Sequence, residues 1–387
     1  MMSEKGLTSD FILTCLAQFC MSFVFCILLP TIPIYLSSFD VREAEIGVLV
    51  GSLSVSSLSL RPIVGRALLL HPERRFMMLG AFLYIVASLA YLWAPPFWPL
   101  MIVRVLHGVG LAFFATSAFT RVANVVPDSH RGQMVSYFYL ANNVAFALAP
   151  YLGMHLYNHL GFKVVFGVCA ALSVVALFIS AKLKKMQGLP RKEGSPRTQP
   201  LLNREALSPA AMAFLVNFIW GAITAFFPLY AFSQGVRNPG LFFAAFALLL
   251  ILGRGLGGKV LDLYDRDRVM FPCLIAYPIS MAILAFSKTM PWFLAVAVIW
   301  GAGNAFLYPS LLILAIDRAG ALRGPAMGTF TAVADLGTGM GAMIMGTVLQ
   351  WSSYRWMFLC LALAGVLNIL YFLFFVREKG GVRHADL

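Results

Sequence analysis

Apolar runs of membrane-spanning length recur along the whole chain, and they constrain its fold more than any motif does. A helix needs about 20 predominantly apolar residues to cross a bilayer. Twelve segments meet that requirement: 11–36, 44–68, 76–94, 98–124, 134–158, 163–183, 209–232, 240–261, 269–288, 292–316, 326–350 and 356–376. Only 12% of the residues are charged, against about 25% in soluble domains. The sequence therefore predicts an all-α membrane protein with twelve transmembrane helices.

One polar segment divides these spans into two sets of six. Residues 184–208 are rich in basic residues and proline and contain glycine and serine, a composition typical of flexible linkers. We therefore expect an N-terminal six-helix bundle over 1–183, a cytoplasmic linker over 184–208 and a C-terminal six-helix bundle over 209–387.

Lysine and arginine are unevenly distributed between the two sides of this arrangement. With a cytoplasmic N-terminus, the inner loops, tails and adjoining helix ends hold 23 of the 29 basic residues, and the outer loops hold five. Positive charge favours the cytoplasmic side. We expect both termini in the cytoplasm and the chain in the cell membrane, which is the inner membrane in a Gram-negative bacterium. The net charge of +13 then faces anionic lipid and calls for no nucleic-acid partner.

The two halves also repeat each other weakly in sequence. The stretch "RPIVGRALLLHPERR" from Arg61 matches "RGLGGKVLDLYDRDR" from Arg254 at an offset of 193 residues, and "HGVGLAF" from His107 matches "WGAGNAF" from Trp300 at the same offset. Repeated halves with the main site at their interface are a common transporter design. The pattern predicts two pseudo-symmetric bundles.

Together these features resemble the major facilitator superfamily over nearly the whole chain. More narrowly, the chain resembles the twelve-span drug:proton antiporters and the arabinose-efflux-permease-like sugar exporters. The loop signature of the family, roughly G-x-L-A-D-R-x-G-R-R, corresponds here to "GRALLLHPERR" at 65–75, with Leu69 in place of the aspartate. The second copy, "GKVLDLYDRDR", keeps an aspartate. The resemblance implies a gating-loop motif made of Gly65, Arg66, Arg74, Arg75, Gly258, Lys259 and Asp262.

Two further elements carry the resemblance. Where the family has R-x-x-Q-G-x-G in helix 4, this chain has "RVLHGVG" from Arg104, with His107 in the glutamine position. The antiporter helix-5 element G-x-x-x-G-P-x-x-G corresponds to "AFALAPYLG" at 145–153, which keeps Pro150 and Gly153 as a helix-bend motif.

Asp335 is an acidic residue inside an otherwise apolar run. It lies about nine residues into the eleventh span, about 14 Å along a helix that rises 1.5 Å per residue. A carboxylate at that depth costs several kcal/mol unless it is paired, hydrated or protonated, and such a group can bind and release a proton as access alternates. A structural carboxyl bonded to a neighbouring helix is the alternative.

Arg104 is taken as the one basic residue well inside a span, with His107 three residues on and on the same helical face. The resemblance associates such an arginine with proton coupling, so Asp335, Arg104 and His107 are the candidate proton-coupling residues. An arginine that bonds helix-end carbonyls is the structural alternative. Polar residues at membrane depth are the substrate-cavity candidates: Asn142, Asn143, Asn217, Trp220, Asn304 and Tyr308. Gly337, Gly339 and Gly341 predict close helix contacts.

These observations favour a proton-coupled exporter of a small organic molecule, working by alternating access and as a monomer. An importer of a sugar, amino acid or organic acid stays open, and so does a membrane receptor that transports nothing. We expect no enzymatic activity, cofactor or metal, because the sequence contains no P-loop, no G-x-S-x-G and no H-E-x-x-H. The positive Arg104 and the single acid favour neutral or anionic substrates over polycations.

Overall fold

The computed structural model describes residues 8–68, 70–95, 97–125, 131–184, 203–263, 266–318 and 323–376. Within these ranges, the side chains at 123, 125, 131–133, 135, 136, 254–263, 266 and 323–325 lie outside the description.

The first half of the chain forms five long helices. They are α1 (Ser9–Ser37), α2 (Glu43–Ala67), α3 (Glu73–Ala90), α4 (Trp98–Val125) and α5 (Arg131–Lys182). α5 consists of two helical arms that meet at Gly161, whose φ of 77° and ψ of 175° are not helical. Glycine adopts positive φ without steric cost. The arms correspond to the predicted spans 134–158 and 163–183.

The second half forms six helices and one short turn. They are α6 (Leu207–Ser233), α7 (Gly240–Leu263), α8 (Arg266–Leu284), α9 (Met290–Arg318), α10 (Arg323–Trp351), α11 (Tyr354–Tyr371) and a π-helical turn (Phe372–Val376). Every predicted span overlaps one of the helices or one arm of α5. Nine helices in the described part of the chain are long and apolar enough to cross a membrane, with α5 counted once. The predicted all-α membrane fold is confirmed.

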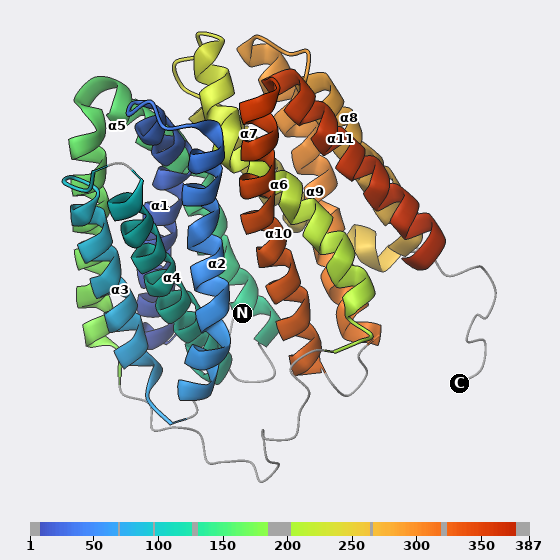
Figure 1. The fold of residues 1–387 in the computed structure, drawn as a ribbon. Coiled ribbons are helices and arrows are strands. Elements are labelled where there is room, and N and C mark those ends of the chain that lie inside the picture. The colour runs from blue at the N-terminus through green and yellow to red at the C-terminus, as the bar shows by residue number, and fades with distance from the viewer. Residues whose placement is uncertain are drawn as a thin grey trace, which may run out of the picture.

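The helices gather into two groups that lie side by side (Figure 1). We call α1–α5 the N-half and α6–α11 the C-half. The end of the molecule at which α2 ends and α6 and α10 begin is the linker end, at the bottom of Figure 1. The opposite end is the far end. The halves touch mainly where α2 packs on α10, α5 on α7 and α1 on α6.

Small residues bring α2 and α10 together at the far end. A Cβ atom added to Gly47 would lie 2.4 Å from the carbonyl oxygen of Ala342, and one added to Gly346 would lie 2.7 Å from that of Glu43. Nearer the middle, a Cβ on Gly51 would lie 2.6 Å from the carbonyl oxygen of Gly339. Real Cβ atoms do not approach that closely, so these positions admit only glycine in this packing. The far end is therefore closed between α2 and α10, and a cavity of about 560 Å³ remains beside it, between the α1–α2 loop and the end of α6.

The end of the predicted linker is packed rather than free. Asn203 is buried, and its backbone N–H donates to Thr329 Oγ1 in α10 at 2.9 Å. Its side-chain oxygen accepts hydrogen bonds from the N–H groups of Glu205 and Ala206, directly before α6. These bonds satisfy donors that a helix start leaves without partners. Residues 203–206 are thereby tied to the C-half.

Arg121 joins four segments of the N-half at the linker end. Its side chain is fully buried in α4 and donates to Asp10 Oδ2 in α1 and to the carbonyl oxygen of Lys184 after α5. Glu73 Oε2 at the start of α3 lies 4.0 Å from Arg121 Nη1. Glu73 also accepts a hydrogen bond from Asn124. A buried charge with these partners fixes how the helix ends meet.

We expect Arg121→Ala to lower the stability of the protein by about 3 kcal/mol or more, because it leaves the carboxylates of Asp10 and Glu73 without their buried cation. Thermal unfolding of the detergent-purified protein measures the loss. Arg75→Ala, at an exposed position at the start of α3, is the matched control and should unfold at nearly the same temperature as the parent. Equal unfolding temperatures for the two variants would contradict this role.

Candidate functional site

An ion pair joins the two halves near the middle of the molecule. Arg61 of α2 donates from Nη1 to Asp335 Oδ2 of α10. Both side chains keep about a third of their surface exposed, 34% and 31%, because cavities adjoin them. The pair lies in the α2–α10 contact, closer to the linker end than Gly51 and Gly339. It is therefore placed to respond when the halves move apart.

This pair corrects one sequence-based expectation, which concerns the basic residues at membrane depth. Arg104 is not the one basic residue well inside a span, since Arg61 lies six residues before the end of α2. The sequence placed Arg61 only at the start of the repeated loop motif. Its position inside an apolar run, before that run ends, was the signal that could have identified it.

Asp335 and Arg61 line a cavity of about 160 Å³ to which both halves contribute. We call it the shared chamber. Its polar lining consists of Ser54, Ser57, Arg61, Asn217, Asp335 and Thr338. Trp220 of α6 closes one side, and its ring lies 5.4 Å from that of Phe146 across the boundary between the halves. Asn217 accepts a hydrogen bond from Thr338 at 3.4 Å. Both Asn217 and Trp220 were predicted cavity residues, and the structure brings them together with Asp335.

Arg61 also lines a second cavity of about 200 Å³ that lies wholly within the N-half. We call it the N-half chamber. Its polar lining consists of Gln18, Ser22, Arg61, Tyr84 and Asn142. Asn142 accepts a hydrogen bond from Ser22 at 2.8 Å, and Ser22 accepts one from Gln18 at 2.9 Å. The sequence analysis identified Asn142 but missed Gln18 and Tyr84.

A larger cavity lies on the linker-end side of the ion pair. It has a volume of about 580 Å³ and is lined by Leu58–Arg66 of α2 and by residues 328–332 of α10. We call it the linker-end groove. Arg61 lines this groove as well as both chambers. The site is thus bordered by open space toward the linker end and by the glycine contacts of α2 and α10 toward the far end.

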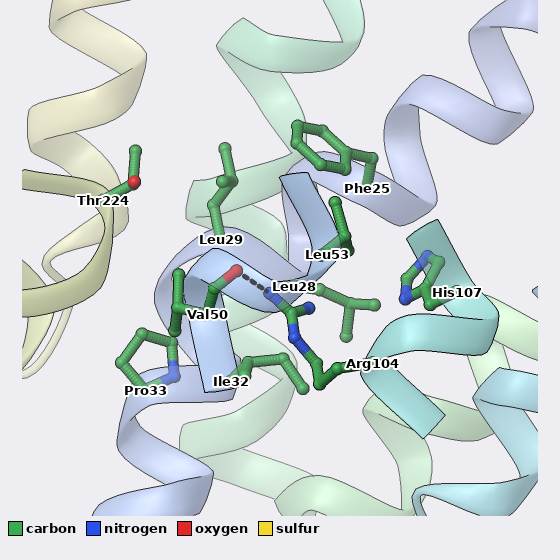
Figure 2. Close-up of a pocket in the computed structure, with 10 residues that line it drawn as sticks. All are labelled: Phe25, Leu28, Leu29, Ile32, Pro33, Val50, Leu53, Arg104, His107 and Thr224. Carbon is green, nitrogen blue, oxygen red and sulfur yellow. Dashed lines mark hydrogen bonds between the residues drawn. The ribbon is translucent and has the colours of Figure 1, made fainter. Parts of the chain in front are cut away.

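Arg104 and His107 lie apart from Asp335. They line a cavity of about 20 Å³ between α1, α2, α4 and α6, which Figure 2 shows from within the bundle. Arg104 Nε donates to the carbonyl oxygen of Leu49 at 2.9 Å, and Nη2 donates to that of Val50 at 3.0 Å. His107 is fully buried, with Nδ1 3.3 Å from Tyr91 Oη and its ring 4.1 Å from that of Tyr84. The guanidinium thus bonds two backbone carbonyls inside α2 rather than at a helix end, and its part in proton coupling stays a prediction.

We expect Arg104→Gln to lower the stability of the protein by about 1–3 kcal/mol, because two carbonyls of α2 lose charged donors. Thermal unfolding measures this loss, with the exposed Arg66→Gln as control. The resemblance predicts a part in proton coupling instead. That prediction would gain support if Arg104→Gln changed the number of protons moved per substrate and left the unfolding temperature unchanged.

The remaining cavity candidates have other surroundings. Asn304 donates to Tyr277 Oη at 2.7 Å and so links α9 to α8. Tyr308 packs its ring against Phe330 of α10 at 5.6 Å. Asn143 is buried. None of these three residues lines the two chambers or the linker-end groove, and their role in binding stays a prediction.

The sequence motifs are only partly visible. Arg66 lines the linker-end groove, and the position of a Cβ on Gly65 meets no atom within 4 Å. Arg74 and Arg75 occupy the first turn of α3. Gly258, Lys259 and Asp262 lie outside the side chains that the structure describes, as does Leu69. In α5, a Cβ on Gly153 would lie 3.0 Å from Ile27 Cγ2 in α1, and the carbonyl oxygen of Pro150 lies where Gly240 of α7 approaches.

Two groups of apolar helices, with a charged pair and small cavities between them, define a multi-pass membrane transporter. Comparison with known proteins agrees: the family model described as Major Facilitator Superfamily matches residues 14–253 and 238–386. The chain belongs to this superfamily. The family, the predicted fold and the general function of transport are thereby confirmed.

Individual relatives cover most of the chain. The Staphylopine export protein of Staphylococcus aureus is 24% identical over 364 residues, covering 88% of this chain and 90% of its own. The Quinolone resistance protein NorA of the same species is 20% identical, with coverages of 89% and 91%. Among solved structures, a crystal structure of the nucleoside transporter NupG has a TM-score of 0.77 at 15% identity, covering 95% of this chain and 98% of that one. This last likeness concerns the fold alone.

Proposed function

We propose that this transporter exports a small organic molecule in exchange for protons, with Asp335 as the proton-binding group. The Arg61–Asp335 ion pair carries the proposal. A carboxylate that pairs with an arginine of the other half loses that partner whenever α2 and α10 separate at the linker end. Proton binding and the relative position of the halves then depend on each other, which is what coupled transport requires.

The shape of the molecule supports alternating access. Space adjoins the ion pair toward the linker end, whereas glycine contacts bring α2 and α10 together toward the far end. The distribution of lysine and arginine favours the linker end as the cytoplasmic side. In this proposal the structure faces the cytoplasm, and both termini and the linker lie inside a cell membrane. The Staphylopine export protein and NorA support export by likeness.

Small-molecule profiling tests the direction of transport. Cells that overproduce the protein and cells that lack it are compared for metabolites in the cytoplasm and in the medium. A compound enriched in the medium of overproducing cells names the substrate for vesicle assays. In inside-out vesicles, that compound should accumulate only when the lumen is acidified, and a protonophore should abolish the accumulation. Enrichment inside the overproducing cells would instead overturn export.

A further inference from the structure

Arg61 stands between two chambers of different chemistry. The N-half chamber contains the fully buried Tyr84, whose hydroxyl has no hydrogen-bond partner among the described residues. Arg61 donates a hydrogen bond from Nη1 to Asp335 and makes no further hydrogen bond within the described part of the chain. No acidic side chain lines this chamber where the structure describes it. The remaining N–H groups of Arg61 and the hydroxyl of Tyr84, in a chamber whose described lining contains no acid, suit an anionic group.

The shared chamber has the opposite character. Asp335 is its acid, and Arg61 is the charged group that lies against it; the described lining from α1, α4 and α6 contributes no titratable side chain. The indole of Trp220 lines the same chamber. An aromatic face attracts cations, and a carboxylate pairs with them. An ammonium group of a ligand therefore fits here.

A ligand that enters between Arg61 and Asp335 must replace the partner of each. A molecule with one charge satisfies only one member of the pair and leaves the other without its partner, a cost that a molecule with both charges avoids. We propose that the central site binds a zwitterion of about amino-acid size, with its anionic group on Arg61 in the N-half chamber and its ammonium group on Asp335 in the shared chamber. This inference rests on the proposed function, because it takes the ion pair as the substrate site.

The charge of the ligand fixes the sign of the coupling. An ammonium group and a proton compete for the same carboxylate, so a zwitterion leaves as Asp335 takes up a proton, and the two are exchanged. A simple anion on Arg61 would instead favour a protonated Asp335, so that anion and proton would bind together. Exchange of a proton for the substrate is what export requires in the proposal above, and it follows from a ligand with both charges.

Binding to the purified full-length protein tests this assignment with probes that share one apolar side chain and differ in their charged groups. Phenylalanine carries both charges, N-acetylphenylalanine only the negative one and phenylethylamine only the positive one. Matched sets built on leucine and on tryptophan extend the comparison to other side chains. We expect at least one zwitterion to bind about tenfold or more tightly than both of its singly charged counterparts, as measured by calorimetry. We also expect that binding to weaken on acidification, in a range where the charges of the probe itself do not change.

Variants separate the site from general effects. Arg61→Gln and Asp335→Asn should each weaken zwitterion binding about tenfold or more, whereas Arg237→Gln, exposed in the loop between α6 and α7 and outside both chambers, should leave it unchanged. The assignment is overturned if no zwitterion binds or if a singly charged counterpart binds equally well. Proton-driven export of a singly charged compound would overturn the zwitterion and leave the proposed function intact. Zwitterion binding without proton-driven flux would support the zwitterion and overturn the proposed function.

Discussion

Asp335→Asn is expected to remove proton-driven transport while the protein still folds. An amide cannot take up a proton at neutral pH, so the gradient no longer acts on the halves. Flux in vesicles with an imposed proton gradient should fall roughly 100-fold or more, the range typical for loss of a positioned proton-transfer group. Exchange of labelled for unlabelled substrate, measured at equal pH on both sides, shows whether the halves still move when proton coupling is lost.

The matched control for this variant is Asp40→Asn. Asp40 is exposed in the loop after α1 and has a φ of 54°, a conformation that asparagine tolerates as well as aspartate. The chemical change is thus the same at a position outside both chambers. Asp40→Asn should transport at the parental rate. Full gradient-driven flux in Asp335→Asn would remove this carboxylate from the mechanism.

Removing Arg61 as well tests whether the two charges act as a pair. Because both side chains are about a third exposed, the stability effect of Asp335→Asn alone should be only about 1 kcal/mol. The double variant Arg61→Gln and Asp335→Asn leaves neither charge without a partner. It should unfold at a temperature no lower than Asp335→Asn does, and it should remain uncoupled.

Gly47→Val is expected to open the far end of the molecule. Its Cβ would lie 2.4 Å from the carbonyl oxygen of Ala342 in the other half, so the closed arrangement becomes overpacked by about 1–3 kcal/mol. That cost shifts the population of open molecules about 5- to 150-fold. Labelling of a cysteine at Thr224, which is buried in the small cavity beside Arg104, should accelerate accordingly. The background for this assay is the chain with its six cysteines replaced.

The matched control is a glycine whose contact lies inside one half. A Cβ on Gly341 of α10 would lie 2.0 Å from the carbonyl oxygen of Phe218 in α6. Both helices belong to the C-half, so opening the far end does not relieve that contact. Gly341→Val should therefore lower the yield of folded protein without faster labelling at position 224. Equal labelling in the two variants would show that the Gly47 contact does not hold the far end closed.

The glycine positions show what could be predicted from the sequence and what could not. Gly337, Gly339 and Gly341 were predicted to mark close helix contacts, and the structure places all three against backbone or small side chains. Their partners were not predictable. Gly337 and Gly341 meet α6 of the same half, whereas Gly339 meets Gly51 and Val55 of the other half. The spacing of glycines along one helix shows which face carries small residues. Only the packing of the helices decides which neighbour covers that face.

The ion pair also shows which features the sequence determines and which only the tertiary structure decides. The sequence by itself determined twelve spans, because a bilayer requires long apolar helices, and it singled out Asp335, because a carboxylate in such a run is costly. It also determined the family, through motifs in a fixed order. Only the tertiary structure paired Asp335 with Arg61, which is 274 positions away, and placed Arg104 against the carbonyls of α2. A contact between distant helices depends on how the halves meet, and no local pattern in either helix encodes that geometry.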